Sequence, residues 1–174
     1  MNPFVVSLTG CLLALSPLHA SPPAPASQTT PETLHWFSSL PEAEAAAKRQ
    51  KKPMLLLFTG SDWCSWCKRL QKEVLASPMF RQFARERLIL MEIDFPRLKP
   101  MPLEQHHANL MLAERFGVLG FPTLILLNEQ GNKLEEFGFP KGGAESLVSR
   151  IEAALNTASL NSPNASKTAS SPAK

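Results

Sequence analysis

Cysteine is scarce in this chain of 174 residues: there are three, and only Cys64 and Cys67 lie outside the first 20 residues. A small exported domain that used cysteines as staples would spread two or more bridges across distant segments, because closing long loops constrains the unfolded chain most. Two cysteines three positions apart constrain almost nothing. The scarcity therefore disfavours a disulfide scaffold and favours a chemical role for this pair.

Long runs of one charge and long apolar runs are also missing. Lysine and arginine number 18 against 15 acidic residues, and no basic block is interleaved with aromatic residues. The usual signature of a nucleic-acid-binding surface is therefore absent from the sequence. The apolar stretch at residues 4–15 is about a dozen residues long, whereas a membrane-spanning helix needs roughly 20.

Residues 1–20 nevertheless have the length and composition of a signal peptide, because residues 4–15 suit its apolar region and a small residue, Ala20, ends it. No lysine or arginine marks the start of this leader, and a second cut at residues 24–26 leaves the cleavage site open. Cys11 ends a sequence that resembles a lipoprotein box, but the apolar run continues beyond it, which disfavours lipid anchoring. We expect a periplasmic protein.

Composition divides the rest of the chain into three parts. Residues 21–33, rich in proline, serine and threonine, predict a linker with polyproline character. Residues 157–174 are mostly small and polar and predict a disordered tail. Between them, residues 34–156 predict one domain that is large enough to bury an apolar core.

Apolar periodicity in this domain predicts an α/β fold. Helical patterns alternate with runs of strand length, and three of these runs are nearly continuous in leucine, isoleucine, methionine and phenylalanine, as in strands covered on both faces. The order of elements describes a central mixed sheet of four to five strands with helices on both faces. Strands are expected at residues 54–58, 88–93, 123–127 and 133–139, and helices at 41–50, 64–76, 103–116 and 144–155.

The position of the cysteine pair indicates its chemistry. The pair follows the first buried strand and opens a helix, where unpaired N–H groups carry partial positive charge worth up to about 2 kcal/mol to an anion. An effect of that size would hold the pKa of a thiol well below its ordinary value. Cys64, at the helix start, is then expected to be the exposed nucleophile. Cys67 shares a stripe with Leu70 and Val74 and is expected to point inward and resolve the mixed disulfide.

Residues 63–68 (Trp-Cys-Ser-Trp-Cys-Lys) resemble the W-C-x-x-C-K motif of the thioredoxin superfamily. Residues 117–123 (Gly-Val-Leu-Gly-Phe-Pro-Thr) resemble its second signature, and the resemblance covers roughly residues 34–156. It implies a thioredoxin fold, catalytic roles for Cys64 and Cys67, and a cis bond before a proline that faces the cysteines. It also implies a substrate groove, whose expected members are Trp63, Ser65, Trp66, Phe121, Pro122 and Gly138.

The interior behind the cysteines departs from the superfamily pattern. Many thioredoxins keep a buried aspartate six residues before the first cysteine and a lysine on the neighbouring strand, where this chain has Phe58 and Leu90. Losing both partners together avoids an unpaired buried charge. The proton acceptor for Cys67 therefore stays open, with Glu92 as a candidate.

The residues around the cysteines favour a reducing couple. Ser65 and Trp66 supply no cation between the cysteines, where oxidases and isomerases of the superfamily commonly have a histidine. Lys68 would assist the thiolate through its positive charge, and Asp62 would oppose it. We therefore expect a moderate lowering of the thiol pKa, as in a reductase, and not the extreme lowering of a strong oxidant.

Residues 59–68 look most like those of exported thioredoxin-like reductases of the DsbH type. This resemblance implies a protein-disulfide reductase that acts on disulfide-containing exported proteins. Because exported compartments lack a soluble supply of reductant, its chemistry implies a DsbD-like membrane protein as electron donor. We expect a monomer that needs no cofactor. The rival within the superfamily is a periplasmic thiol oxidase or disulfide isomerase. A binding domain on an inactive scaffold is disfavoured because both cysteines are present.

A metal-binding module is the alternative from another class. Cys64 and Cys67 could combine with His106 and His107 as four ligands. Zinc sites usually separate their histidines by about three to five residues, so adjacent histidines fit poorly. A solvated histidine pair is the simpler interpretation.

Overall fold

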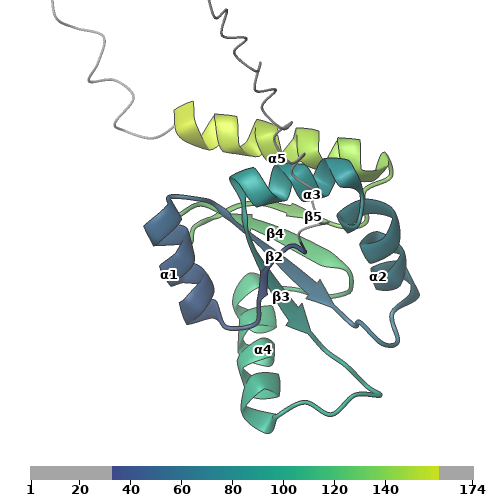
Figure 1. Cartoon of the computed structure of the whole chain (residues 1–174). Coiled ribbons are helices and arrows are strands. Elements are labelled where there is room, and N and C mark those ends of the chain that lie inside the picture. Colours follow the sequence, from purple (N-terminus) through teal and green to yellow (C-terminus); the bar gives the residue numbers. More distant parts are fainter. Residues whose placement is uncertain (1–32, 161–174) are drawn as a thin grey trace, which may run out of the picture. The chain divides into compact units, whose positions relative to one another are not determined.

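The computed structural model describes residues 33–160. The predicted signal peptide, Cys11, nearly all of the predicted linker and most of the predicted tail lie outside the described residues. Figure 1 shows the described residues as a sheet with helices on both of its faces. Between residues 33 and 160, no helix has both the length and the apolar character that a membrane span requires.

The sheet has five strands in the order β1-β3-β2-β4-β5. Strands β1, β3 and β2 run parallel, whereas β4 is antiparallel to β2 and β5 is antiparallel to β4. This is the mixed sheet that the order of elements predicted. The strands are β1 (Trp36–Phe37), β2 (Met54–Thr59), β3 (Ile89–Asp94), β4 (Thr123–Leu127) and β5 (Lys133–Phe137).

The three central strands form because their side chains are apolar on both faces. Every residue of β2 and of β4 is buried, and the polar side chains of β3 come only near its end. Their alternate residues enter two separate apolar clusters, one on each side of the sheet. The edge strand β5 is more polar and is mostly exposed or half-buried.

Helices cover both faces of this sheet (Figure 1). Helices α1 and α4 pack with one cluster, which contains Ala43, Phe58 and Leu112. Helices α2, α3 and α5 pack with the other, which contains Leu70 and Phe80. The helices are α1 (Leu40–Gln50), α2 (Ser65–Leu70), η1 (Gln71–Leu75), α3 (Pro78–Arg87), α4 (Leu103–Phe116) and α5 (Gly143–Leu160).

Two elements escaped the sequence prediction. Helix α3 begins at an N-cap, where the hydroxyl of Ser77 accepts the N–H of Phe80, and Pro78 occupies the first turn. Only Phe80 and Ala84 of this helix are buried, so its apolar periodicity is weak. Strand β1 has two residues and is defined by its pairing with Leu90 and Met91, which no local pattern reveals.

The ends of two predicted helices were wrong. The helix expected at residues 64–76 is two elements, because α2 widens into the π-helical turn η1, where Ala76 donates its N–H to the carbonyl of Gln71, five residues earlier, at 2.9 Å. Helix α5 runs to Leu160, so residues 157–160 of the predicted disordered tail are helical. The hydroxyls of Thr157 and Ser159 bond to carbonyls four residues earlier, which lets these polar residues continue the helix.

Candidate active site

Cys64 and Cys67 form a disulfide at the start of α2, with their Cα atoms 5.2 Å apart. Cys64 is the N-cap residue of this helix, and its Sγ accepts the backbone N–H of Cys67 at 3.1 Å. An amide of the first helical turn therefore reaches the sulfur, and the same amide would stabilise a thiolate on Cys64 after reduction. The helix start predicted from sequence is where the structure places this residue.

The two cysteines do not differ in exposure as predicted. Cys64 is 7% exposed and Cys67 is 4% exposed, so both count as buried in the oxidised protein. The physical reason is the bond itself, because bridging to Cys67 turns the sulfur of Cys64 toward the first helical turn. Cys67 does share its buried stripe with Leu70 and Val74, as expected. Position at the helix start, and not exposure, therefore distinguishes the two sulfurs.

The carboxylate of Asp62 is bound to the backbone of the loop after β3. Its carboxylate accepts the backbone N–H groups of Arg97, Leu98 and Lys99 at distances between 2.7 and 3.2 Å. Desolvation raises the pKa of Asp62, but these three N–H groups and its own amide outweigh that effect and hold the pKa below its ordinary value. Asp62 thus stays ionised to fix the loop after β3.

Lys68 bonds to the connection between β2 and Cys64, which contains Asp62. Its Nζ donates to the backbone carbonyl of Asp62 at 2.7 Å. The ammonium therefore helps to hold residues 60–63, which connect β2 to Cys64. Its assistance to the thiolate stays a proposal, because the bond in the structure is to the loop.

Three neighbouring residues hold the side chain of Trp63 in place. Its indole N–H donates to the carbonyl of Phe95 at 2.8 Å, and the guanidinium carbon of Arg97 lies 3.8 Å from its ring centroid. A Cβ on Gly60 would approach the indole to 2.5 Å, so only glycine fits at that position. Trp63 is half-buried and directly precedes Cys64 in the chain.

The loops after β2 and β3 are joined as one unit. Ser61 donates both its backbone N–H and its hydroxyl to the carboxylate of Asp94, at 2.8 and 2.6 Å. Sequence reasoning missed Asp94, Phe95 and Arg97. A signal was available, because adjacent parallel strands bring the loops at their carboxyl ends together, and ligand sites in α/β folds gather there.

Trp66 projects from the first turn of α2 and is 54% exposed. Its ring meets the ring of Phe139 edge-on, with centroids 5.2 Å apart. The guanidinium of Arg69 lies 5.3 Å from both ring centroids, and its Nε lies 2.9 Å from both carboxylate oxygens of Glu73. Trp66 has the surface position expected of it, whereas Arg69 and Phe139 are neighbours that the sequence did not single out.

The second signature lies against the first. The peptide bond between Phe121 and Pro122 is cis, as the resemblance implied. The ring of Phe121 stacks on Phe95 with centroids 5.0 Å apart and meets Trp63 edge-on at 6.1 Å. Residues 121–122 are therefore connected to Trp63, which immediately precedes Cys64.

Two further predicted groove residues are on the surface. Ser65, the first residue of α2, is exposed, and so is Gly138, which follows β5. A Cβ on Gly138 would meet nothing within 4 Å, and the next residue, Phe139, contacts Trp66. The end of β5 therefore reaches the aromatic surface beside Cys67.

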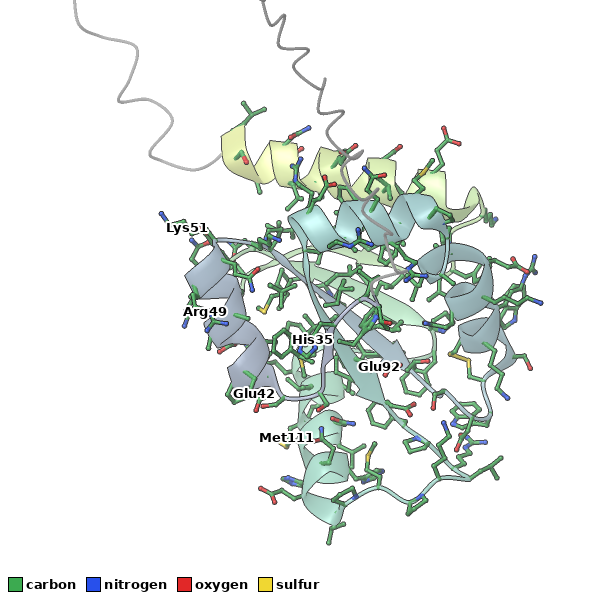
Figure 2. The ribbon with its side chains drawn as sticks, in the orientation of Figure 1. His35, Glu42, Arg49, Lys51, Glu92 and Met111 are labelled. Atoms are coloured by element: carbon green, nitrogen blue, oxygen red, sulfur yellow. A yellow bond between two sulfur atoms is a disulfide. The ribbon has the colours of Figure 1, made fainter. Side chains whose placement is uncertain are left out.

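The interior contains no buried acid where many thioredoxins have one. Phe58 and Leu90 are buried among apolar side chains. Glu92 is half-buried on β3, where Figure 2 labels it. Desolvation raises its pKa, the neighbouring Asp94 carboxylate raises it further, and Lys99 acts in the opposite direction. Glu92 remains the candidate proton acceptor for Cys67.

The alternative metal site is not assembled. Within residues 33–160, no group of three or more histidine, cysteine, aspartate or glutamate side chains is placed to hold a metal ion. His106 and His107 lie exposed on α4, and the ring of His106 faces Phe95 at 6.4 Å. The four residues of that interpretation are therefore not brought together within residues 33–160.

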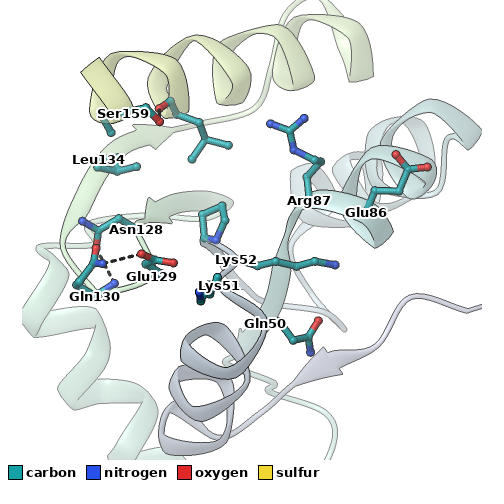
Figure 3. Close-up of a pocket in the computed structure, with 13 residues that line it drawn as sticks. Gln50, Lys51, Lys52, Glu86, Arg87, Asn128, Glu129, Gln130, Leu134 and Ser159 are labelled. Atoms are coloured by element: carbon teal, nitrogen blue, oxygen red, sulfur yellow. Dashed lines mark hydrogen bonds between the residues drawn. The ribbon is translucent and has the colours of Figure 1, made fainter. Parts of the chain in front are cut away.

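A pocket of about 760 Å³ lies away from the cysteines (Figure 3). Its wall includes Pro53, which precedes β2, and Asn128, which follows β4, so it lies at the end of the sheet opposite to Cys64. None of the predicted site residues lines it. The redox site is therefore a surface around the disulfide, and this pocket is not part of it.

Comparisons with known proteins agree with this geometry. A family model, the thioredoxin-like domain, matches residues 40–142. The chain is 36% identical over 156 residues to disulfide bond reductase DsbH of Chlamydia pneumoniae, with 86% of this chain and 93% of that protein covered. It is 28% identical over 107 residues to thioredoxin-related protein DsbJ of the same organism, covering 62% of this chain and 31% of that protein.

Solved structures lead to the same conclusion. A DsbH oxidoreductase matches with a TM-score of 0.67 and 40% identity, over 71% of this chain and 85% of that one. A thioredoxin from Thermus thermophilus, at a TM-score of 0.55 and 18% identity over 70% of this chain and 87% of that one, shows the fold alone. The thioredoxin fold predicted from the two signatures is confirmed. The chain belongs to the thioredoxin-like domain family and, with both cysteines of its C-x-x-C present, is a thiol–disulfide oxidoreductase.

Proposed function

We propose that this protein reduces disulfide bonds in exported proteins. The observation that carries the proposal is the Cys64–Cys67 pair at the start of α2, with an amide of the first turn on the sulfur of Cys64. Two facts support the reducing direction. The residues between the cysteines, Ser65 and Trp66, supply no cation, and the chain is similar over most of its length to a disulfide bond reductase.

The reaction moves two electrons from the dithiol to the substrate. The thiolate of Cys64 attacks one sulfur of a substrate disulfide, which forms a mixed disulfide and releases the first substrate thiolate to take up a proton. Cys67 then loses its proton and attacks Cys64 Sγ, which releases the second substrate thiolate. The protein ends with the Cys64–Cys67 bond that the structure contains.

The assignment of Cys64 as the attacking residue follows from its place at the helix start. The N-cap position gives it the unpaired amides and the positive end of α2. Cys67 lies one turn later among buried apolar residues, which disfavours its ionisation until the mixed disulfide has formed. Glu92, whose pKa is raised by desolvation and then by Asp94, is the proposed proton acceptor for this second step.

Turnover requires a donor of two electrons for each disulfide reduced. Oxidising exported compartments do not keep thiols reduced, so the electrons must come from elsewhere. We assign this role to a DsbD-like membrane protein, as the chemistry of a reductase in such a compartment implies. The chain is itself similar to part of such a protein, with 28% identity over 99 residues to DsbD of Klebsiella pneumoniae, covering 57% of this chain and 15% of that protein.

The proposed location is the periplasm, and the support for it is the sequence of residues 1–20, which has the length and composition of a signal peptide. Residues 34–156 are the proposed catalytic domain, which acts as a monomer. The family match at residues 40–142 lies within this range.

Trapping the intermediate tests the mechanism. The reduced protein is mixed with a disulfide-bonded substrate such as insulin, quenched with acid and examined for mixed disulfides and new substrate thiols. Wild type should release substrate thiols, Cys67→Ser should accumulate a mixed disulfide on Cys64, and Cys64→Ser should do neither. A mixed disulfide that accumulates on Cys67 in Cys64→Ser, and not on Cys64 in Cys67→Ser, would reverse the roles.

A further inference from the structure

Arg97 places a cation beside the redox motif that the reaction described above does not use. It lies in the connection between β3 and α4, and its side chain is exposed. Its guanidinium carbon lies 3.8 Å from the ring centroid of Trp63, the residue immediately before Cys64. At this distance the cation rests on the face of the indole ring. The guanidinium therefore lies on the side chain of the residue that adjoins Cys64 in the sequence.

The backbone of Arg97 is fixed independently of its side chain. Its N–H donates to the Asp62 carboxylate at 3.0 Å, and the next two N–H groups, of Leu98 and Lys99, donate to the same carboxylate. Two residues earlier, the Phe95 carbonyl accepts the indole N–H of Trp63. The side chain can therefore be replaced without removing the hydrogen bonds that hold this loop to the motif.

The charge of Arg97 is unpaired in the part of the chain that the structure describes. The comparable cation on the other tryptophan, Arg69, has both carboxylate oxygens of Glu73 at 2.9 Å from its Nε. Arg97 forms no ion pair with any residue from 33 to 160. The carboxylate of Asp62 contacts the backbone of Arg97 and accepts three N–H groups of this loop. The guanidinium thus keeps its donors for an external acceptor.

We propose that Arg97 is a specificity-determining residue that binds a carboxylate next to the disulfide of the substrate, so that acidic flanking sequences are reduced faster. This proposal rests on the proposed function. A guanidinium suits this role because its planar array of N–H donors matches a carboxylate with two parallel hydrogen bonds. The indole ring on which the guanidinium rests restricts its orientation and shields one face of the guanidinium from water.

The test uses two short peptides with the same internal disulfide. In one an aspartate flanks a cysteine, and in the other an asparagine of nearly equal shape takes its place. The reduced protein is mixed with each peptide, and the second-order rate constant of disulfide reduction is measured. Wild type should reduce the aspartate peptide about three to ten times faster, and this ratio should fall as salt is added. Arg97→Gln should bring the ratio to one, and Arg97→Glu should bring it below one.

Two control variants separate this effect from a general effect of arginine on aromatic rings. Arg69→Gln should keep the preference for aspartate, because Glu73 already neutralises that cation. Arg115, which rests on the Phe116 ring at 5.1 Å on α4, gives a second cation–π control, and Arg115→Gln should keep both rate constants. Arg97→Lys should keep part of the preference, because lysine keeps the positive charge but lacks the planar pair of N–H donors.

The possible failures are distinguishable. If wild type reduces neither peptide, the proposed function fails and the inference about Arg97 fails with it. If wild type reduces both peptides at equal rates, or if Arg97→Gln keeps the preference for aspartate, the reductase proposal stands and the role of Arg97 is refuted.

Discussion

The two tryptophans of the motif share a sequence context but have opposite surroundings. Trp63, with Phe95 and Arg97, forms what we term the Arg97 group, and Trp66, with Arg69 and Phe139, forms the Arg69 group. In the Arg97 group the indole N–H is bonded to Phe95, and the cation has no ion pair with residues 33–160. In the Arg69 group the tryptophan is 54% exposed and the cation is paired with a carboxylate.

This difference indicates two ways in which the site can contact a substrate. The Arg97 group is fixed by hydrogen bonds and carries charge, so it can select by the sign of a neighbouring side chain. In the Arg69 group, Trp66 is held by ring and cation contacts alone within the described residues, so it can shift to fit varied apolar surfaces. A reductase with many clients needs the second property, and the first would set preferences among them.

Replacing the two tryptophans by alanine should show the largest contrast. Trp63→Ala removes a hydrogen bond, a cation–π contact and half-buried ring area, and we expect a loss of about 2–4 kcal/mol in the free energy of unfolding. Trp66→Ala removes a mostly exposed ring and should cost under about 1 kcal/mol. Urea unfolding of the oxidised proteins measures both. Equal losses would abolish the distinction between a fixed and an adaptable group.

Gly60→Ala tests how tightly the Trp63 ring is packed against residue 60. The new Cβ would lie 2.5 Å from the indole, so the ring must move, and we expect a destabilisation of about 1–3 kcal/mol. Gly138→Ala is the matched control, because its Cβ meets nothing within 4 Å and its stability should change by less than about 0.5 kcal/mol. If Gly138 lines the groove, the same variant should reduce protein disulfides more slowly. A stable Gly60→Ala would show that the Arg97 group is loosely held.

Asp62→Asn should loosen the loop of the Arg97 group in a pH-dependent way. The pKa of Asp62 is lowered in the folded protein, so its contribution to stability is present above the ordinary aspartate pKa and is lost as the pH falls through the folded value. The variant should therefore be less stable than wild type at neutral pH, and the two should converge in acid. Faster hydrogen exchange at the amides of residues 97–99 would locate the change. A pH-independent difference would contradict the account.

Glu92→Gln should have the smallest effect on stability. The pKa of Glu92 is raised in the folded protein, so the ionised form opposes folding at neutral pH and the protonated form does not. The variant should be slightly more stable than wild type at pH 7, with the gain vanishing as the pH falls below the ordinary glutamate pKa. If Glu92 accepts the proton of Cys67, the variant should also slow resolution of the mixed disulfide without slowing its formation. Unchanged resolution would remove Glu92 from the mechanism.

The sequence predicted the parts of the site that are local. The strand before Cys64, the helix start and the buried stripe of Cys67 follow from apolar periodicity and the spacing of the motif. The Arg97 group could not be predicted in that way, because Asp62 and Arg97 are 35 residues apart and meet only when β2 and β3 pair in parallel. The same limitation hid Phe139, which contacts Trp66 through the end of β5.

The partners of the charged groups could not be predicted from the sequence. The expectation that Asp62 opposes the thiolate stays a prediction, and the structure adds that its carboxylate accepts three backbone N–H groups. The exposure predicted for Cys64 was wrong, because both cysteines are buried in the disulfide-bonded protein. Local position predicted the place of the motif's own residues, and tertiary contacts determined which residues surround them.

The central claim is that the dithiol reduces, and its redox potential tests that claim most directly. Equilibrating the protein with reduced and oxidised glutathione, and measuring the fraction with the Cys64–Cys67 bond, gives the potential. We predict a value close to that of thioredoxin, about −270 mV. A value near that of the strong oxidant DsbA, about −120 mV, would contradict the account and make the protein an oxidase.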